Sequence, residues 1–264
     1  MKLRTGFFFI GLLVLSCNNS SNEPVTKQDL PIQEKEMKEA ISKYPDSVLL
    51  KQNLIQYYQD NGSIEMALVE TNKALAKDSG DASFWDKKAE LYALQDDTSN
   101  AINAYEHAIS IYPDPQYVMS LGWLYAKTKN SKAIEMGDAL LEAKKAHAEK
   151  EGMLIKGLYY AATGNTNQAL VYFDNALSMD YTFMFAYREK AIVLFNLGKY
   201  EEAITVLSKA VTLQNKFDEG YYWIAKCYEK LNNRDNAIKN YKLALLYNPD
   251  FIEASDALGK LGIK

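Results

Sequence analysis

Apolar residues recur along most of this chain at the three- and four-residue spacing of an amphipathic helix. In one such segment Ala67, Leu68, Thr71, Ala74 and Leu75 fall on one helical face. Between the segments, a residue that tolerates a left-handed backbone recurs every 34 positions, and such residues close helix C-termini. These turn residues are Gly62, Asp96, Asn130, Gly164, Gly198 and Asn232. The spacing therefore predicts a series of helix–turn–helix units of equal length.

A small residue also recurs within the first helix of most predicted units, and a large, usually aromatic residue follows three positions later. Small side chains let two helices approach closely, and the larger side chain fills the space beside them. A single hairpin of this kind cannot cover its own apolar face, so the hairpins are expected to stack as a solenoid. The small positions are Ala89, Gly157, Ala191, Ala225 and Gly259.

The pattern resembles the tetratricopeptide repeat, a helical hairpin of 34 residues. The agreement is best from Trp85 to Pro113 and from Tyr221 to Pro249, where the small, aromatic and proline positions all match. The resemblance implies an all-α fold, a right-handed α-α superhelix over residues 31–264. It would contain an N-terminal helix over 31–44, six helical hairpins and a C-terminal capping helix. The hairpins are expected at 48–81, 82–115, 116–149, 150–183, 184–217 and 218–251.

The third unit departs from the pattern in its second helix. Glu135 and Glu142 stand where other units have alanine, and the helix is predicted to run on through Ala148. Its apolar residues form an amphipathic set that is rotated about the helix, which predicts a kink or stagger before the fourth unit. This irregularity could be repeat decay without function or a feature that binds a partner. The rotated set is Ala133, Ile134, Gly137, Leu140 and Leu141.

The first 17 residues are organised like the start of a bacterial lipoprotein. Lys2 and Arg4 precede an apolar run from Phe7 to Leu15, which is too short to cross a bilayer and is typical of a signal peptide. The run ends in Val14-Leu15-Ser16-Cys17, which resembles a lipobox with leucine where a small residue is commoner. The resemblance implies a signal peptide over 1–16 and lipidation of Cys17. An ordinary secretory signal with a chance cysteine is the alternative.

Residues 17–30 would then be the lipidated cysteine and a flexible tether, because this segment is polar and lacks helical periodicity. Several acyl chains, palmitate among them, would attach the protein firmly to a membrane. No aspartate follows Cys17 directly, and aspartate there retains lipoproteins at the inner membrane of some bacteria. We therefore expect attachment to the outer membrane facing the periplasm, with display on the cell surface as the second option.

Nothing in the sequence nominates an active site. His107 and His147 share no metal-ligand spacing, and no nucleotide-binding, zinc-protease or nucleophile motif occurs. Apart from Cys17, the cysteine Cys227 lies on an apolar helix face, so it is predicted to be a core residue. The net charge of −4 argues against a nucleic-acid partner. We therefore expect a protein that is not an enzyme and that has no catalytic residue, no metal and no cofactor.

In tetratricopeptide arrays the first helices of successive units line an inner groove where peptides bind. At these positions the first two units carry polar residues, among them Gln52, Gln56, Gln59, Asp86 and Glu90. The lysine, asparagine and arginine set with which some relatives hold a terminal carboxylate is missing there. Capture of chaperone tails by such a clamp is therefore not expected.

In units three to six the corresponding residues are mostly large and apolar, with Arg188 as the chief cation. About half of them are expected to pack between neighbouring helices. The others would form an exposed apolar groove, which is typical of a partner-binding site. The predicted groove residues are Met119, Trp123, Leu154, Leu158, Phe185, Arg188, Ile192, Phe195 and Tyr222.

Two functions agree with these features. The first is a membrane-anchored scaffold or adaptor of the bacterial cell envelope that binds an envelope protein or peptide in the groove. The alternative is a surface lipoprotein that binds a small ligand or glycan, which would need convergent polar groups beside the aromatic residues. Self-association as a homodimer is a further option, since apolar grooves often mediate it.

Overall fold

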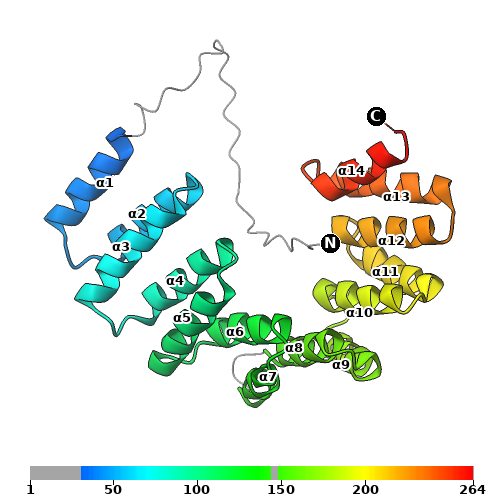
Figure 1. Ribbon diagram of the computed structural model, residues 1–264, viewed down its shortest axis with the longest axis horizontal. Coiled ribbons are helices and arrows are strands. Elements are labelled where there is room, and N and C mark those ends of the chain that lie inside the picture. The colour runs from blue at the N-terminus through cyan, green and yellow to red at the C-terminus, as the bar shows by residue number, and fades with distance from the viewer. Residues whose placement is uncertain (1–30, 144–147, 264) are drawn as a thin grey trace, which may run out of the picture. The chain divides into compact units, whose positions relative to one another are not determined.

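The computed structural model describes residues 31–143 and 148–263 (Figure 1). Within these residues every regular element is an α-helix, which confirms the predicted all-α fold. The chain divides into two compact units, one ending at Tyr112 and the other beginning at Pro113. The predicted signal peptide, Cys17, the tether and His147 lie outside the described residues.

The first unit consists of one leading helix and two helical hairpins. Its buried core includes Leu54, Ile55 and Tyr58 of the second helix and Phe84 and Leu91 of the fourth. Ala67 of the third helix, on the apolar face predicted from the sequence, is fully buried. The helices are α1 (Pro31–Lys43), α2 (Val48–Asp60), α3 (Ile64–Lys77), α4 (Ala82–Leu94) and α5 (Thr98–Ile111).

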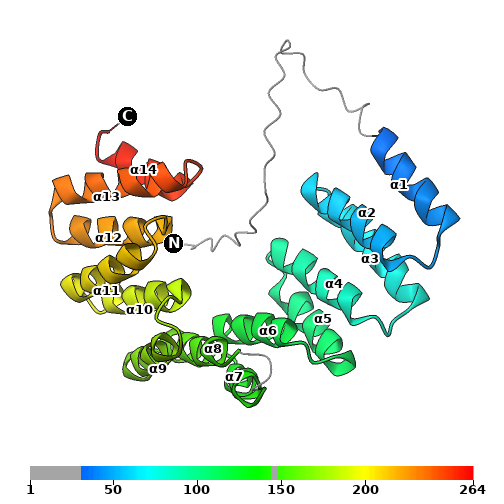
Figure 2. The same ribbon diagram turned by 180° about the vertical axis from the view of Figure 1, so that it is seen from behind.

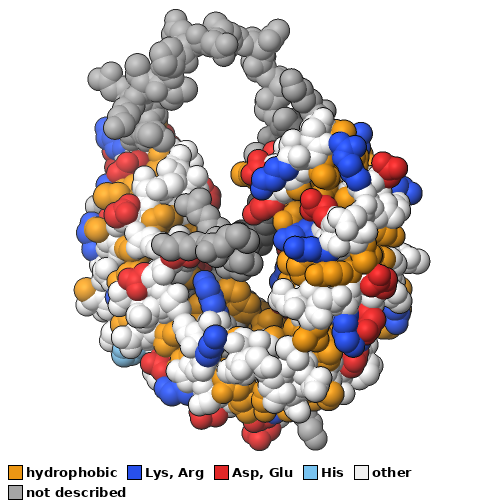
Figure 3. All heavy atoms as spheres, turned by 45° about the vertical axis from the view of Figure 1, so that its right-hand side comes forward, with side chains coloured by type: hydrophobic (Ala, Val, Ile, Leu, Met, Phe, Trp, Pro, Cys, Tyr) orange, Lys and Arg blue, Asp and Glu red, His pale blue; other side chains and the backbone are white. Residues whose placement is uncertain are grey.

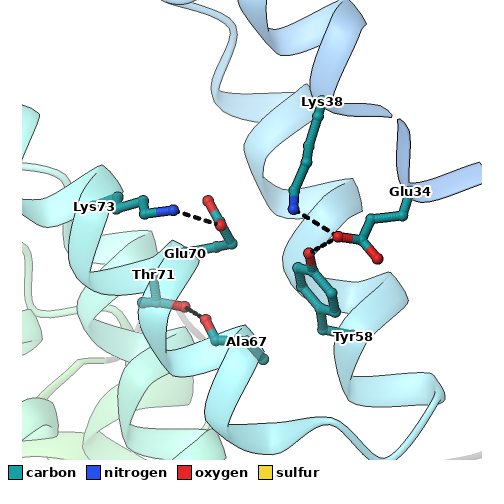
Figure 4. A network of polar contacts seen from close by, with 7 residues as sticks. All are labelled: Glu34, Lys38, Tyr58, Ala67, Glu70, Thr71 and Lys73. Carbon is teal, nitrogen blue, oxygen red and sulfur yellow. Dashed lines mark hydrogen bonds and ion pairs between the residues drawn. The ribbon is translucent and has the colours of Figure 1, made fainter. Parts of the chain in front are cut away.

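Helix α1 is attached to α2 through a carboxylate (Figure 4). Glu34 Oε1 accepts hydrogen bonds from Lys38 Nζ at 2.6 Å and from the Tyr58 hydroxyl at 2.7 Å. These hydrogen bonds, the one from Lys38 first, lower the pKa of Glu34. In α3 the buried Thr71 hydroxyl donates to the Ala67 carbonyl oxygen at 2.8 Å, so this hydroxyl is not left unpaired.

The second unit consists of four hairpins and a capping helix, seen from both sides in Figures 1 and 2. Alanines that recur at the repeat spacing in its second helices, such as Ala169, Ala203 and Ala237, are fully buried. The helices are α6 (Pro115–Lys127), α7 (Lys132–Glu142), α8 (Glu149–Ala162), α9 (Thr166–Met179), α10 (Met184–Asn196), α11 (Tyr200–Leu213), α12 (Asp218–Lys230), α13 (Arg234–Tyr247) and α14 (Ile252–Lys260).

The turn prediction is confirmed at five of its six positions and wrong at Asn130. Gly62, Asp96, Gly164, Gly198 and Asn232 have positive φ, but in the third unit Lys129 takes this role with φ 59°. The reason is a shift of one residue in α6, which starts at Pro115 after the N-cap Asp114. Proline favours the first helical position, so the helix begins and ends one residue early. The Asn130 side chain instead accepts a hydrogen bond from the Lys132 amide at 3.0 Å.

The predicted extension of the third unit's second helix is also wrong. Helix α7 ends at Glu142 with 11 residues, whereas the other second helices have 14. Ala148 is already the N-cap of α8, so a helix running through it would leave no residues to reverse the chain. The rotated apolar face is confirmed, because Ala133, Gly137 and Leu140 are buried while Glu135 and Glu142 are exposed.

Candidate partner-binding surface

The predicted groove residues all lie on the first helices of the second unit, namely α6, α8, α10 and α12. Because α6 is shifted by one residue, Met119 and Trp123 correspond to the α8 residues that follow them by 35 positions, not by 34. Two columns result, one helical turn apart, and we call them together the first-helix surface. The columns are Met119–Leu154–Arg188–Tyr222 and Trp123–Leu158–Ile192–Lys226. None of these eight residues is fully buried.

Several of the predicted groove residues also contribute to the core, as expected. Leu154 and Leu158 pack against the buried cluster of Ala169, Phe173 and Val193. Phe195 packs against the cluster that contains Leu207, and its ring contacts Trp223 edge to face at 5.5 Å. The Tyr222 ring lies 4.9 Å from that of Phe251 and 5.7 Å from that of Tyr241. These side chains have one packed side and one accessible side.

Phe185 is the predicted groove residue that is most available to a partner. It is 54% exposed, on the first turn of α10. The Arg188 guanidinium lies over its ring at 5.1 Å, and the Phe183 ring contacts it at 6.0 Å. An exposed aromatic ring beside an arginine is the kind of contact that dominates protein interfaces.

Arg188 is already neutralised within the chain. Its Nη1 donates to both carboxylate oxygens of Glu219 on α12, at 2.8 and 2.7 Å, and its Nε donates to Glu189 at 2.9 Å. Burial lowers the pKa of Arg188, but the two carboxylates outweigh it and the net shift is upward. Burial raises the pKa of Glu189 in spite of the neighbouring guanidinium. Arg188 therefore joins α10 to α12 and is not a free cation.

The sequence interpretation missed Lys226, which completes the second column. Its ammonium lies over the rings of Trp223 at 4.7 Å, Tyr222 at 5.6 Å and Phe195 at 5.6 Å. Burial lowers the pKa of Lys226. The signal for this residue was present, because Lys226 stands 34 positions after Ile192 in the same column. Figure 3 shows one face of the molecule, where hydrophobic side chains form patches separated by charged ones.

Three of the polar residues of the first unit form local hydrogen bonds or ion pairs, whereas the buried side-chain oxygen of Gln59 has no partner among the described residues. Gln52 donates to the Ser83 hydroxyl at 3.1 Å, Gln56 donates to Asp60 at 2.7 Å, and Glu90 pairs with Lys87. Three polar side chains that bond to neighbours on the same or the next hairpin do not make a carboxylate-binding set.

The other residues with potential chemistry have structural roles. Cys227 is fully buried, as predicted, and burial raises the pKa of its thiol to about 12. The exposed His107 ring stacks on Trp85 with ring centroids 4.4 Å apart.

In the described part of the chain no three histidine, cysteine or acidic side chains gather as a metal site would require. No helix among residues 31–143 and 148–263 is long and apolar enough to cross a bilayer.

Comparison with protein families finds tetratricopeptide repeat models at residues 82–115 and 156–219. A third model, the regulator of microtubule dynamics protein 1-3, matches residues 188–259. No catalytic family is among these matches. The segment 82–115 coincides with the second predicted hairpin.

Among curated proteins, a TPR repeat-containing protein of Methanocaldococcus jannaschii is 33% identical over 126 residues, which are 48% of this chain and 37% of that protein. The DnaJ homolog subfamily C member 7 of Mus musculus is 30% identical over 106 residues, which are 40% of this chain and 22% of that protein. The matched part thus spans well under half the length of these relatives.

Among solved structures, a tetratricopeptide repeat protein from Parabacteroides merdae has a TM-score of 0.72 at 22% identity, covering 89% of this chain and 93% of the other. PilW, described as a type IV pilus biogenesis factor, has a TM-score of 0.61 at 21% identity, covering 79% of this chain and 97% of the other. At such identities the likeness is one of fold. Together with the family models, it shows that this chain carries tetratricopeptide repeats and folds as a tetratricopeptide-repeat solenoid.

Proposed function

We propose that this protein is a membrane-anchored scaffold of the bacterial cell envelope that binds a partner protein through the first-helix surface. The observation that carries the proposal is the exposed Phe185 beside Arg188, at the edge of two columns of half-buried, mostly apolar residues. Stacked hairpins supply such a surface without needing a closed pocket or a reactive group. Non-catalytic interaction is also the typical use of the repeat.

Support for the envelope role comes from the N-terminal sequence. An apolar run of signal-peptide length ends at Leu15, and Cys17 follows two residues later, where a lipobox requires its cysteine. One protein of similar fold, PilW, is described as a type IV pilus biogenesis factor. We place the protein at the outer membrane, facing the periplasm.

Site-specific photocrosslinking in the source cells tests the partner site. A photoreactive phenylalanine analogue at Phe185 should give a specific crosslinked protein, identifiable by mass spectrometry. The matched control is the same analogue at Val171, which is 52% exposed but lies on the second helix α9. Identical products from both positions, or no product from position 185, would contradict the proposal. A crosslinked product of twice the chain's mass would instead identify self-association.

Membrane attachment is tested separately. Replacement Cys17→Ser should move the protein from the membrane fraction to the soluble fraction, because the acyl chains supply the binding energy. Wild-type protein that labels with palmitate and resists added protease in intact cells would agree with the periplasmic orientation. Unchanged membrane association of Cys17→Ser would rule out the lipid anchor.

A further inference from the structure

The half-buried cations of α8, α10 and α12 differ in one respect. Four of the five form an ion pair with a carboxylate, whereas no carboxylate among the described residues forms an ion pair with Lys226. The four pairs are Lys150–Asp180, Lys156–Asp138, Arg188–Glu219 and Lys190–Asp174. The chain thus neutralises every half-buried cation on these helices except the one in the second column.

The surroundings of Lys226 are aromatic. Phe195 of α10 and Tyr222 and Trp223 of α12 place their rings within 5.6 Å of its ammonium. Glu229, one turn further along α12, accepts a hydrogen bond from the Tyr241 hydroxyl; its negative charge favours the Lys226 ammonium without forming an ion pair with it. The rings attract the ammonium but cannot accept a charge-assisted hydrogen bond as a carboxylate does.

A half-buried ammonium that forms no direct ion pair has lost part of its hydration, and a carboxylate in contact has not replaced it. A carboxylate supplied by a partner would make that pair beside aromatic rings, and the partner would cover it from bulk water, which strengthens it. The burial that lowers the pKa of Lys226 agrees with this partial loss of hydration.

Apolar side chains lie on both sides of Lys226. Ile192 and Leu158 continue its column towards α8, and Tyr222 packs on Phe251, towards α14. A bound segment could therefore continue past the ammonium in both directions. This favours the side chain of an internal residue over a terminal carboxylate, at which the partner's chain would stop.

We propose that the first-helix surface binds a peptide segment whose internal Asp or Glu side chain pairs with Lys226 and whose flanking apolar side chains contact Ile192, Phe195 and Trp223. This inference rests on the proposed function and names the chemistry of the partner.

Selection from a library of random 12-residue peptides, displayed with both ends blocked, tests the inference with the full chain. Peptides that bind should be enriched in Asp or Glu next to apolar residues. Replacing that acid by Gln or Asn in a synthetic peptide should weaken binding about tenfold, the effect of one hydrogen bond to a charged group. Replacement Lys226→Gln should weaken binding of the acidic peptide by the same factor and leave binding of the Gln or Asn peptide unchanged. The control Lys230→Gln, at an exposed lysine of the same helix, should change neither.

Each other outcome overturns the inference. Selected peptides without acidic enrichment, equal affinity of the acidic and amide peptides, or unchanged binding by Lys226→Gln would exclude recognition by Lys226. A free C-terminal carboxylate that restores binding to the amide peptide would show that a chain end is the ligand. If peptides without an acidic residue bind, and Phe185→Ala weakens their binding, the proposed function stands and this inference falls. A library that yields no binding peptide would count against the inference alone.

Discussion

Gly137 of α7 and Gly152 of α8 bring two helix backbones into direct contact. A Cβ atom built on Gly152 would lie 2.6 Å from the carbonyl oxygen of Gly137, and one on Gly137 would lie 2.9 Å from that of Gly152. Distances below 3 Å between such atoms are repulsive, so neither position accepts a side chain without movement. The contact lies within the irregular third repeat, where α7 is short and rotated. Glycine thus replaces alanine as the small residue of this crossing.

Replacement Gly152→Ala should lower the free energy of unfolding by about 1–3 kcal/mol, because the methyl group meets backbone and the helices must move apart. Chemical denaturation of the second unit measures this. The control is Gly259→Ala in α14, where a Cβ meets nothing within 4 Å. That change should be neutral or stabilise by up to about 1 kcal/mol through helix propensity. Equal effects at both positions would disprove the close contact.

The ion pair of Asp180 with Lys150 predicts a pH dependence of stability. The hydrogen bond from Lys150, followed by those from Thr182, lowers the pKa of Asp180 to about 2 in the folded protein, against about 4 in an unfolded chain. The folded state therefore binds this proton less tightly, and the stabilisation is present above about pH 4 and lost as pH falls towards 2.

The replacement Asp180→Asn should accordingly lower the melting temperature more at pH 7 than at pH 3. Lys150→Gln should show the same trend, since it removes the main cause of the shift. Lys190→Gln, which breaks the separate pair with Asp174, serves as the control and should leave the Asp180 effect intact. A difference between wild type and Asp180→Asn that stays constant from pH 7 to 3 would refute the assignment.

Lys199 occupies the N-cap of α11, where the backbone conformation would suit a residue whose side chain caps the helix. Asp97, Asn165 and Asn233 stand at the same repeat position and accept hydrogen bonds from amides of their helices. The Lys199 side chain has no acceptor for these amides and pairs with Glu202 instead. Its φ of −87° and ψ of 62° resemble the −82° and 69° of Asn165. Lys199→Asp should therefore stabilise the protein by about 0.5–1 kcal/mol, measured by urea denaturation. Lys199→Ala should give no such gain, and a stabilisation common to both would point away from capping.

Alanine replacements of Phe185 and Phe195 should differ in their effect on stability, because the first ring lies on the surface and the second packs in the core. Phe185→Ala removes a ring that is 54% exposed and should change the unfolding free energy by less than about 1 kcal/mol. Phe195→Ala removes a ring packed against Trp223 and the buried cluster of α10 and α11, and should cost about 2–3 kcal/mol. Thermal unfolding, monitored by circular dichroism, measures the stability of both variants and of wild type. Similar losses would mean that Phe185 is also structural, which would weaken its use as a crosslinking site.

The sequence by itself determined the repeat, the helices and most of the turns. A 34-residue period is local information repeated six times, so one ambiguous unit does not obscure it. The exceptions have local causes that a single unit cannot reveal. Pro115 shifts α6 by one residue and moves the left-handed turn from Asn130 to Lys129, and the contact at Gly152 accompanies the early end of α7.

Only the tertiary structure decided which groove residues are free. Arg188 reads as an available cation in the sequence, but Glu219, 31 residues later, neutralises it across the junction of α10 and α12. Lys226 reads as an ordinary surface lysine, yet three rings from two helices surround it and no described carboxylate pairs with it. The physical reason is that helix formation follows from neighbours along the chain, whereas the charge and exposure of a side chain depend on which residues the stacking of hairpins brings beside it.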